Sequence, residues 1–133
     1  MNHQFECRVY YEDTDLAGIV YYANYLKFIE RARTEWVRAL GLDQGRLRSD
    51  TGVVFAVRRV EADYLAPARF DDLLQVLTGV QAVGGARVVL RQDVLRGEAL
   101  IFTAIVTLVA LTATGQPTRL PAGFRRVLVP DLP

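Results

Sequence analysis

Histidine, serine and cysteine are almost absent from this 133-residue chain, which holds one of each: His3, Ser49 and Cys7. A Ser–His–Asp triad lacks convincing members, because His3 belongs to a chain terminus and Ser49 to a polar stretch. One cysteine excludes an intramolecular disulfide and a cysteine-based metal cluster, and histidine-ligated zinc is equally disfavoured. No glycine-rich phosphate loop or dinucleotide fingerprint occurs. We therefore expect no metal and no cofactor, and chemistry based on carboxylates, backbone N–H groups, tyrosines, threonines or arginines.

Lysine is also scarce: the chain has one lysine, Lys27, and fifteen arginines. The net charge is only +1. This balance gives no indication of a nucleic-acid partner. The first six residues lack the basic start and the apolar core of a secretory signal. Residues 99–118 carry no charge, but their threonines and β-branched residues favour a buried strand over a membrane span. We expect a single domain over residues 1–133, in the cytoplasm and without a transmembrane segment.

One long helical pattern is present. Residues 22–40 repeat apolar side chains at spacings of three and four, and Gly41 is placed to end the helix. The other patterns predict strands at 5–11, 53–66, 70–83, 86–96 and 99–112. Turn residues between the last four predict three consecutive hairpins in an antiparallel meander. A short helix follows from about residue 120, with a proline in its first turn. These elements predict an α+β fold in which the sheet wraps around the long helix.

The last predicted strand is apolar on both faces. Its two alternating sets are Leu100, Phe102, Ala104, Val106 and Leu108 on one side and Ile101, Ile105, Val109 and Leu111 on the other. Only one face can pack on the helix. Because large exposed apolar patches are rare on monomers, a homo-oligomer is the simple inference.

The residues most suited to chemistry lie just before the long helix. Helix N-termini carry partial positive charge and unpaired N–H donors, and Asp15 lies a short distance upstream of this one. A carboxylate and bare N–H groups brought together in one turn could attack a carbonyl and hold its oxygen. Gly18 would let the backbone turn tightly with no side chain blocking a substrate. On spacing alone, however, Asp13 and Asp15 also fit simple turn and cap positions.

Six segments carry a resemblance to a known family: Val9–Asp15, Ala17–Tyr22, Asn24–Tyr25, Phe28, Glu30–Glu35 and Asp63–Asp72. Together they resemble the hotdog-fold acyl-CoA thioesterases. The resemblance is closest to the branch associated with the Tol-Pal system and to 4-hydroxybenzoyl-CoA thioesterase, and it covers essentially the whole chain. It implies a hotdog fold, in which an antiparallel sheet wraps around one long central helix. It also implies dimers that form a longer sheet with active sites at their interface, and that often associate into tetramers.

The resemblance further implies residue roles. Asp15 matches the catalytic aspartate, which acts as nucleophile or as general base for water, and the backbone N–H of Tyr22 holds the thioester oxygen. The Tol-Pal-associated enzymes carry a histidine at the position of Tyr22, whereas 4-hydroxybenzoyl-CoA thioesterase carries a tyrosine. The implied substrate is an acyl-CoA, with a short-chain aliphatic or aryl group, that is hydrolysed to a free acid and coenzyme A. The other predicted substrate-binding residues are Gly18, Ile19, Val20, Tyr21, Arg87 and Arg91.

Some alternatives stay open. Arg87 and Arg91 could hold coenzyme A phosphates or could be solvated strand residues. A non-catalytic hotdog protein would bind acyl-CoA or a partner in the same cleft, but it has no need of a carboxylate at Asp15. A hotdog dehydratase is disfavoured because those sites resemble histidine–carboxylate pairs, and this chain has no interior histidine. Asn24 could cap the helix or orient the loop before it, and the cap is the favoured interpretation. Cys7 is expected to be a small core residue.

Overall fold

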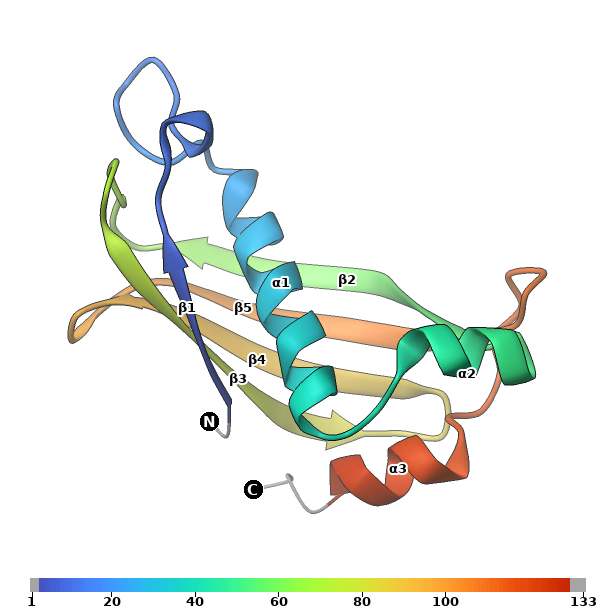
Figure 1. Ribbon diagram of the computed structural model, residues 1–133. Coiled ribbons are helices and arrows are strands. Elements are labelled where there is room, and N and C mark those ends of the chain that lie inside the picture. The colour runs from blue at the N-terminus through green and yellow to red at the C-terminus, as the bar shows by residue number, and fades with distance from the viewer. Residues whose placement is uncertain (1–2, 130–133) are drawn as a thin grey trace.

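The computed structural model describes residues 3–129, which form one antiparallel sheet with a long helix packed on it (Figure 1). The elements are β1 (His3–Arg8), the 3-10 turn η1 (Tyr11–Asp13), α1 (Asn24–Ala39), α2 (Gln44–Thr51), β2 (Val54–Tyr64), β3 (Leu73–Val83), β4 (Arg87–Arg96), β5 (Ala99–Leu111) and α3 (Ala122–Leu128). The strand order is β1-β3-β4-β5-β2, and every neighbouring pair is antiparallel. One long helix on such a sheet is the α+β architecture predicted from the sequence.

The position of β2 differs from the prediction. Strands β3, β4 and β5 follow one another as hairpins, but β2 pairs with β5 and not with β3, so the first of the three predicted hairpins is wrong. Residues 65–72 carry the chain from one side of the sheet to the other. On the way their backbone groups bond to Ile101, Val20 and Val9. Pro67 therefore marks a break in the strand pattern, but a break does not reveal which strand the chain meets next.

The buried stripe of α1 holds the helix on the sheet. Its members recur at helical spacing and are Tyr25, Phe28, Ile29, Ala32 and Trp36. The ring of Tyr25 stacks on Phe102 of β5, with 5.0 Å between ring centroids and 9° between planes. Leu74, Val76 and Val94 lie fully buried in the same core. Burial of each such apolar side chain contributes about 1.5–3 kcal/mol, so this stripe fixes which face of α1 meets the sheet.

A buried polar contact fixes the position of α1 along the sheet. Gln92 of β4 is fully buried, and its amide nitrogen donates to the carbonyl of Ile29 at 2.9 Å and to the hydroxyl of Thr78 at 3.0 Å. Its oxygen accepts a hydrogen bond from Arg33 at 3.1 Å. Because a buried polar group is costly without partners, these contacts select one register of helix on sheet.

The two faces of β5 are both apolar, with one departure from the predicted alternation. The face toward α1 buries Phe102, Ala104 and Val106, and the opposite face leaves Ile105, Val109 and Leu111 half-buried. At the start of the strand, Leu100 is exposed and Ile101 is fully buried. The register between β4 and β5 shifts between Val94 and Leu95, which reverses the expected sides of these two residues.

Of the two shorter helices, the sequence predicted α3 but not α2. α2 was not predicted, although Asp43 accepts the N–H of Arg46 at 3.0 Å as a helix cap and Gly52 ends the helix with φ of 75°. Both are usual helix boundary signals. α3 begins directly after Pro121, as expected for a short helix there. Within residues 3–129, no helix is long and apolar enough to cross a membrane.

Candidate functional site

A small hairpin of residues 13–21 precedes α1 and carries most of the predicted site. The N–H of Tyr21 donates to the carbonyl of Asp13, and the N–H of Asp15 donates to the carbonyl of Ile19, both at 2.9 Å. At the tip, the N–H of Gly18 donates to the carbonyl of Asp15 at 3.0 Å, and Gly18 has φ of +80°. A residue with a Cβ is strained in this conformation, so glycine suits the turn. The hairpin projects beyond the sheet as part of an exposed lobe (Figure 1).

The carboxylate of Asp15 is exposed and held by one short-range contact. Its Oδ1 accepts the N–H of Ala17 at 2.9 Å, which forms an Asx turn at the hairpin tip. Among residues 3–129, its Oδ2 accepts no hydrogen bond. The carboxylate therefore has a fixed direction and one oxygen available for a substrate or a water molecule.

Asp13 has a different environment. It is buried, its Oδ2 accepts the N–H of Tyr10 at 2.8 Å, and its carbonyl accepts the side-chain amide of Asn24 at 2.9 Å. These contacts make Asp13 a structural residue that ties the hairpin to its neighbours. Asn24 is the first residue of α1 and donates to the hairpin, so the prediction that it caps the helix is wrong.

The start of α1 presents backbone N–H groups that have no acceptor in the described part of the chain. The N–H of Asn24 donates to the carbonyl of Tyr21 at 2.8 Å, and the hydroxyl of Tyr64 donates to the carbonyl of Tyr22 at 3.0 Å. Within the described part of the chain, the N–H groups of Tyr22 and Ala23 donate to no protein atom, and no side chain caps the helix. Such groups, at the positive end of a 16-residue helix, favour a negatively charged oxygen.

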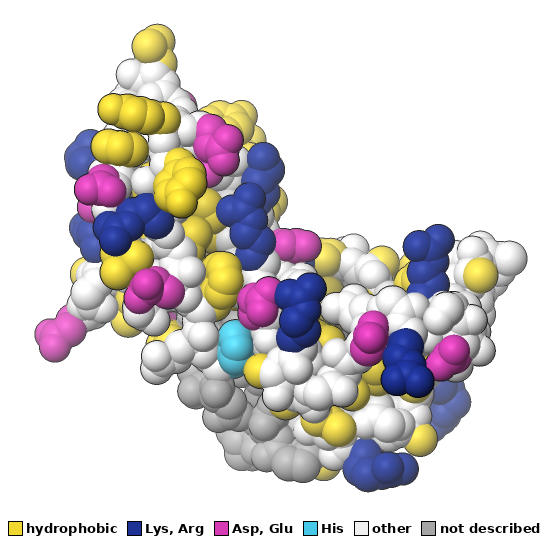
Figure 2. Space-filling view, in the orientation of Figure 1, with side chains coloured by type: hydrophobic (Ala, Val, Ile, Leu, Met, Phe, Trp, Pro, Cys, Tyr) yellow, Lys and Arg dark blue, Asp and Glu magenta, His cyan; other side chains and the backbone are white. Residues whose placement is uncertain are grey.

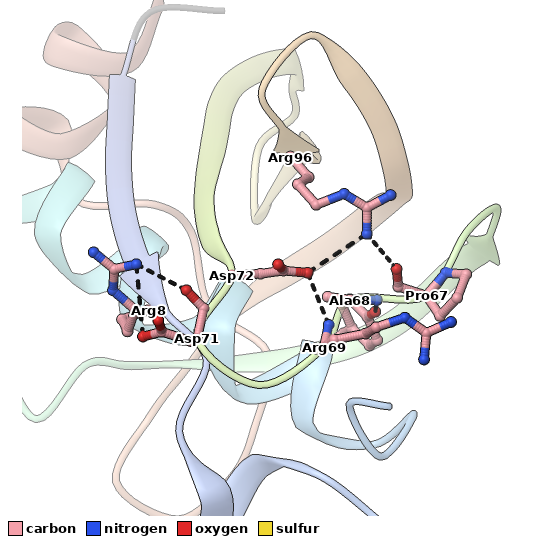
Figure 3. Close-up of polar contacts among 8 residues, drawn as sticks. Arg8, Pro67, Ala68, Arg69, Asp71, Asp72 and Arg96 are labelled. Carbon is pink, nitrogen blue, oxygen red and sulfur yellow. Dashed lines mark hydrogen bonds and ion pairs between the residues drawn. The ribbon is translucent and has the colours of Figure 1, made fainter. Parts of the chain in front are cut away.

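The segment between β2 and β3 braces the hairpin. The N–H of Val20 donates to the carbonyl of Ala68 at 2.8 Å, and the N–H of Ala68 donates to the hydroxyl of Tyr25 at 3.1 Å. Asp72 then holds the segment itself, because its Oδ2 accepts the N–H of Arg69 at 2.8 Å and lies 3.5 Å from Arg96 (Figure 3). The hairpin is thus fixed through Tyr25 to the core and through Asp72 to β4.

A second brace reaches β1. Arg8 donates to the carbonyl of Asp71 at 2.8 Å (Figure 3). The N–H of Asp71 donates to the carbonyl of Val9 at 2.9 Å. Asp71 has φ of 71°, a conformation that residues other than glycine rarely adopt. The contacts on both of its backbone groups hold it there.

Aromatic side chains surround the helix start. Tyr21, Tyr22 and Tyr64 pack edge to face, with ring centroids 5.0 Å apart in the first pair and 6.0 Å apart in the second. All three stay substantially exposed, at 46, 61 and 46%. On the face drawn in Figure 2, hydrophobic side chains gather on this upper part of the molecule, with charged side chains between them. The bare N–H groups therefore lie in an aromatic environment that suits a planar or apolar acyl group.

The two predicted arginines lie away from this lobe. The end of β4 that lies beside the hairpin is marked by Arg96, which donates to the carbonyl of Pro67. Arg87 is at the other end of the strand, nine residues and about 30 Å from Arg96 at 3.3 Å per residue. Arg87 borders a hollow of about 460 Å³ together with Arg58. Arg91 is 3.2 Å from the carboxylate of Asp93. Within one chain, the structure does not bring either arginine to Asp15.

An apolar cavity also lies away from the hairpin. It has a volume of about 260 Å³ and lies beside the second half of α1, where Trp36, Val37, Phe55 and Phe124 are among its lining residues. Arg33 lines it as well, and burial lowers the pKa of that guanidinium. Among residues 3–129, no group of three or more His, Cys, Asp or Glu side chains is placed to hold a metal ion.

Comparison with known proteins identifies the family. Residues 17–102 match the model of the thioesterase superfamily. The chain belongs to the thioesterase superfamily. It is 44% identical over 102 residues to the acyl-CoA thioesterase YbgC of Haemophilus influenzae, covering 77% of this chain and 75% of that protein. It is also 44% identical over 91 residues to the acyl-CoA thioester hydrolase YbgC of Escherichia coli O157:H7, covering 68% of this chain and 67% of that protein.

Solved structures agree with this assignment. The superfamily member superposes on a probable thioesterase from Bartonella henselae with a TM-score of 0.86 and 38% identity, over 90% of this chain and 98% of that one. The hotdog fold expected from the sequence is therefore confirmed.

Sequence reasoning did not reveal the contact of Tyr64 at the site of this thioesterase-superfamily chain. Tyr64 lies within a segment that carried the family resemblance, but nothing in the sequence shows that its hydroxyl reaches the carbonyl of Tyr22, 42 residues away. The contact depends on β2 lying beside β5, which the predicted meander did not allow.

Proposed function

We propose that this chain hydrolyses an acyl-CoA thioester to a free acid and coenzyme A, with Asp15 and the N–H of Tyr22 as the reacting and stabilising groups. One observation carries the proposal: the exposed carboxylate of Asp15 and the N–H of Tyr22, which has no acceptor among residues 3–129, belong to one braced hairpin and the turn that follows it. The relatives named acyl-CoA thioesterase YbgC, at 44% identity, support the choice of reaction.

The chemistry follows from the two groups. The thioester oxygen accepts a hydrogen bond from the N–H of Tyr22, which stabilises the negative charge that develops when the carbonyl carbon is attacked. Asp15 either forms a C–O bond to that carbon or takes a proton from the water that does so. The C–S bond then breaks, and the coenzyme A thiolate leaves and is protonated. In the first case a water molecule hydrolyses the resulting anhydride and releases Asp15. Loss of one such oxyanion donor typically costs roughly 10²–10³-fold in rate.

The residues around these two groups would form the acyl site. We assign the backbone of Gly18, Ile19 and Val20 to one wall of this site, while the Val20 side chain packs in the core, and Tyr21 adds an exposed aromatic ring. Because the rings of Tyr21 and its neighbours are exposed and packed edge to face, an aryl or short aliphatic acyl group fits this surface.

The active form in this proposal is a homo-oligomer. β2 is an edge strand of 11 residues, paired on one side only within residues 3–129, and Val57, Val60 and Tyr64 on it are exposed. A long edge of this kind is a template for pairing with another strand. Antiparallel pairing with a second β2 places the Tyr64 end of one strand beside the Val54 end of the other, which extends the sheet across two copies.

This pairing also gives the predicted arginines a role. Arg87 pairs with Val109, and Val109 pairs with Ala56 near the start of β2, so Arg87 is level with that end of the strand. In a dimer built on β2, the Arg87 of one copy therefore lies level with the catalytic hairpin end of the other. We assign Arg87 to the coenzyme A phosphates on this basis, with Arg91 further along the same strand. Further association of dimers into tetramers and a cytoplasmic location remain parts of this proposal.

The experiment is free-thiol release from a panel of acyl-CoAs with short aliphatic, long aliphatic and aryl groups. Turnover of short aliphatic or aryl thioesters supports the proposal. Binding of acyl-CoA without release of thiol from any member of the panel would favour the alternative, a non-catalytic acyl-CoA-binding or scaffold protein.

A further inference from the structure

We propose that Tyr64 is a positioning residue for the oxyanion donor: its hydroxyl holds the carbonyl of Tyr22 and so limits the rotation of the residue that carries the donor N–H. The proposal rests on the proposed function, because it concerns the same hydrolysis. The bond from the Tyr64 hydroxyl to the Tyr22 carbonyl is 3.0 Å long and joins residues 42 positions apart. Tyr64 would not touch the substrate carbonyl, and its effect would pass through the backbone of Tyr22.

The turn at the start of α1 is held at two successive carbonyls. The carbonyl of Tyr21 accepts the N–H of Asn24 at 2.8 Å, and the carbonyl of Tyr22 accepts the Tyr64 hydroxyl. In a trans peptide the C=O and the following N–H point in opposite directions. The first bond therefore orients the N–H of Tyr22, and the second limits rotation of the residue at its other end. Without the Tyr64 hydroxyl, only the first restraint remains.

The Tyr64 ring is itself held by the core. Its centroid lies 5.6 Å from Tyr25 and 5.1 Å from Phe102, and both contacts are edge to face. Tyr25 and Phe102 are among the buried residues beneath α1. A tyrosine hydroxyl is a protonated donor at neutral pH, and burial raises the pKa of the Tyr64 hydroxyl further. The carbonyl of Tyr22 is thus tied through one rigid side chain to the sheet.

Tyr64 also ends β2, the strand whose free edge we assign to the second copy. The same residue therefore links the oxyanion turn to the subunit boundary. Pairing of β2 with a second copy would restrain Tyr64 further, and with it the turn at Tyr22. Assembly would in this way affect the rate of thioester hydrolysis.

The test is Tyr64→Phe, which deletes the hydroxyl and keeps the ring. Tyr11→Phe is the matched control, because the Tyr11 ring stacks on Phe70 at 4.1 Å and its hydroxyl makes no hydrogen bond within residues 3–129. We expect kcat of Tyr64→Phe to fall about 5- to 10-fold with KM changed less than about twofold. Affinity for a non-hydrolysable thioether analogue of the substrate, melting temperature and oligomer size should match those of the parent, as should all parameters of the control.

The outcomes separate this assignment from the function itself. If Tyr64→Phe keeps the parent kcat while Asp15→Asn is inactive, the role of Tyr64 is wrong and the proposed function stands. If Tyr64→Phe raises KM and weakens analogue binding but leaves kcat unchanged, the positioning role of Tyr64 is also wrong, because Tyr64 would then act in ground-state binding. A parent protein that turns over no thioester overturns both proposals.

Discussion

Replacement of Gln92 by leucine tests how α1 is held on the sheet. Gln92 is fully buried and joins three partners: the carbonyl of Ile29, the hydroxyl of Thr78 and the guanidinium of Arg33. Leucine has a similar volume and makes none of these bonds. The largest cost falls on Thr78, which is also fully buried and loses the donor to its oxygen. A buried polar group left without a partner costs about 1–3 kcal/mol.

The other two losses are smaller. The Ile29 carbonyl lies within α1, where it also accepts a helical hydrogen bond, and Arg33 is only partly buried and can rehydrate. Each contributes about 0.5–1 kcal/mol, and the gain from a buried leucine offsets part of the sum. We therefore expect Gln92→Leu to lower the free energy of unfolding by about 2–3 kcal/mol, which lowers Tm by about 6–12 °C for a chain of this size.

The assay is thermal and urea unfolding followed by circular dichroism at one fixed protein concentration, because assembly would make Tm concentration-dependent. The control is the double variant Gln92→Leu with Thr78→Val, in which both partners of the buried bond are apolar. It should be more stable than Gln92→Leu alone, because no hydroxyl is left unpaired. A single variant as stable as the parent, or a double variant no better than the single one, would refute this account.

Three other parts of the structure lead to predictions. Gly18→Ala should lower the free energy of unfolding by about 1 kcal/mol and reduce kcat, because an alanine is strained at φ of +80° even though the space around its Cβ is open. Unchanged activity would show that the hairpin tip tolerates the strain. Val60→Lys on the edge of β2 should give a 14.9 kDa species in light scattering with reduced activity, and a fully active parent of that mass would contradict the shared site. Burial raises the pKa of the Cys7 thiol, so alkylation at pH 8 should be at least about 10-fold slower than in urea; equal rates would contradict its burial.

The fold was predictable from the sequence wherever a pattern was local. The apolar spacing in α1 and the β-branched runs of β3, β4 and β5 indicate their own structure, because each element buries one face or both. The pairing of β2 with β5 was not predictable, since it depends on a long-range choice that Pro67 does not encode. α2 is polar and buries no residue, so only its cap residues Asp43 and Gly52 could have revealed it.

For the candidate site too, local arrangements were predictable from the sequence and long-range contacts were not. The closeness of Asp15, Gly18 and Tyr22 follows from sequence, because one hairpin contains the first two and leads to the third. Contacts made across the fold do not follow, and the hydroxyl of Tyr64 is the clearest case. The separation of Arg87 from Asp15 could not be predicted either, because it depends on the direction in which β4 runs relative to the hairpin.

The central claim is that the carboxylate of Asp15 performs the reaction, and Asp15→Asn tests it most directly. Asparagine keeps an oxygen that can accept the N–H of Ala17, so the Asx turn should persist and only the charge and nucleophile are lost. We predict that kcat for the best acyl-CoA of the panel falls by about 10²–10⁴-fold, with Tm and oligomer size unchanged. A variant that hydrolyses the thioester as fast as the parent would contradict the mechanism.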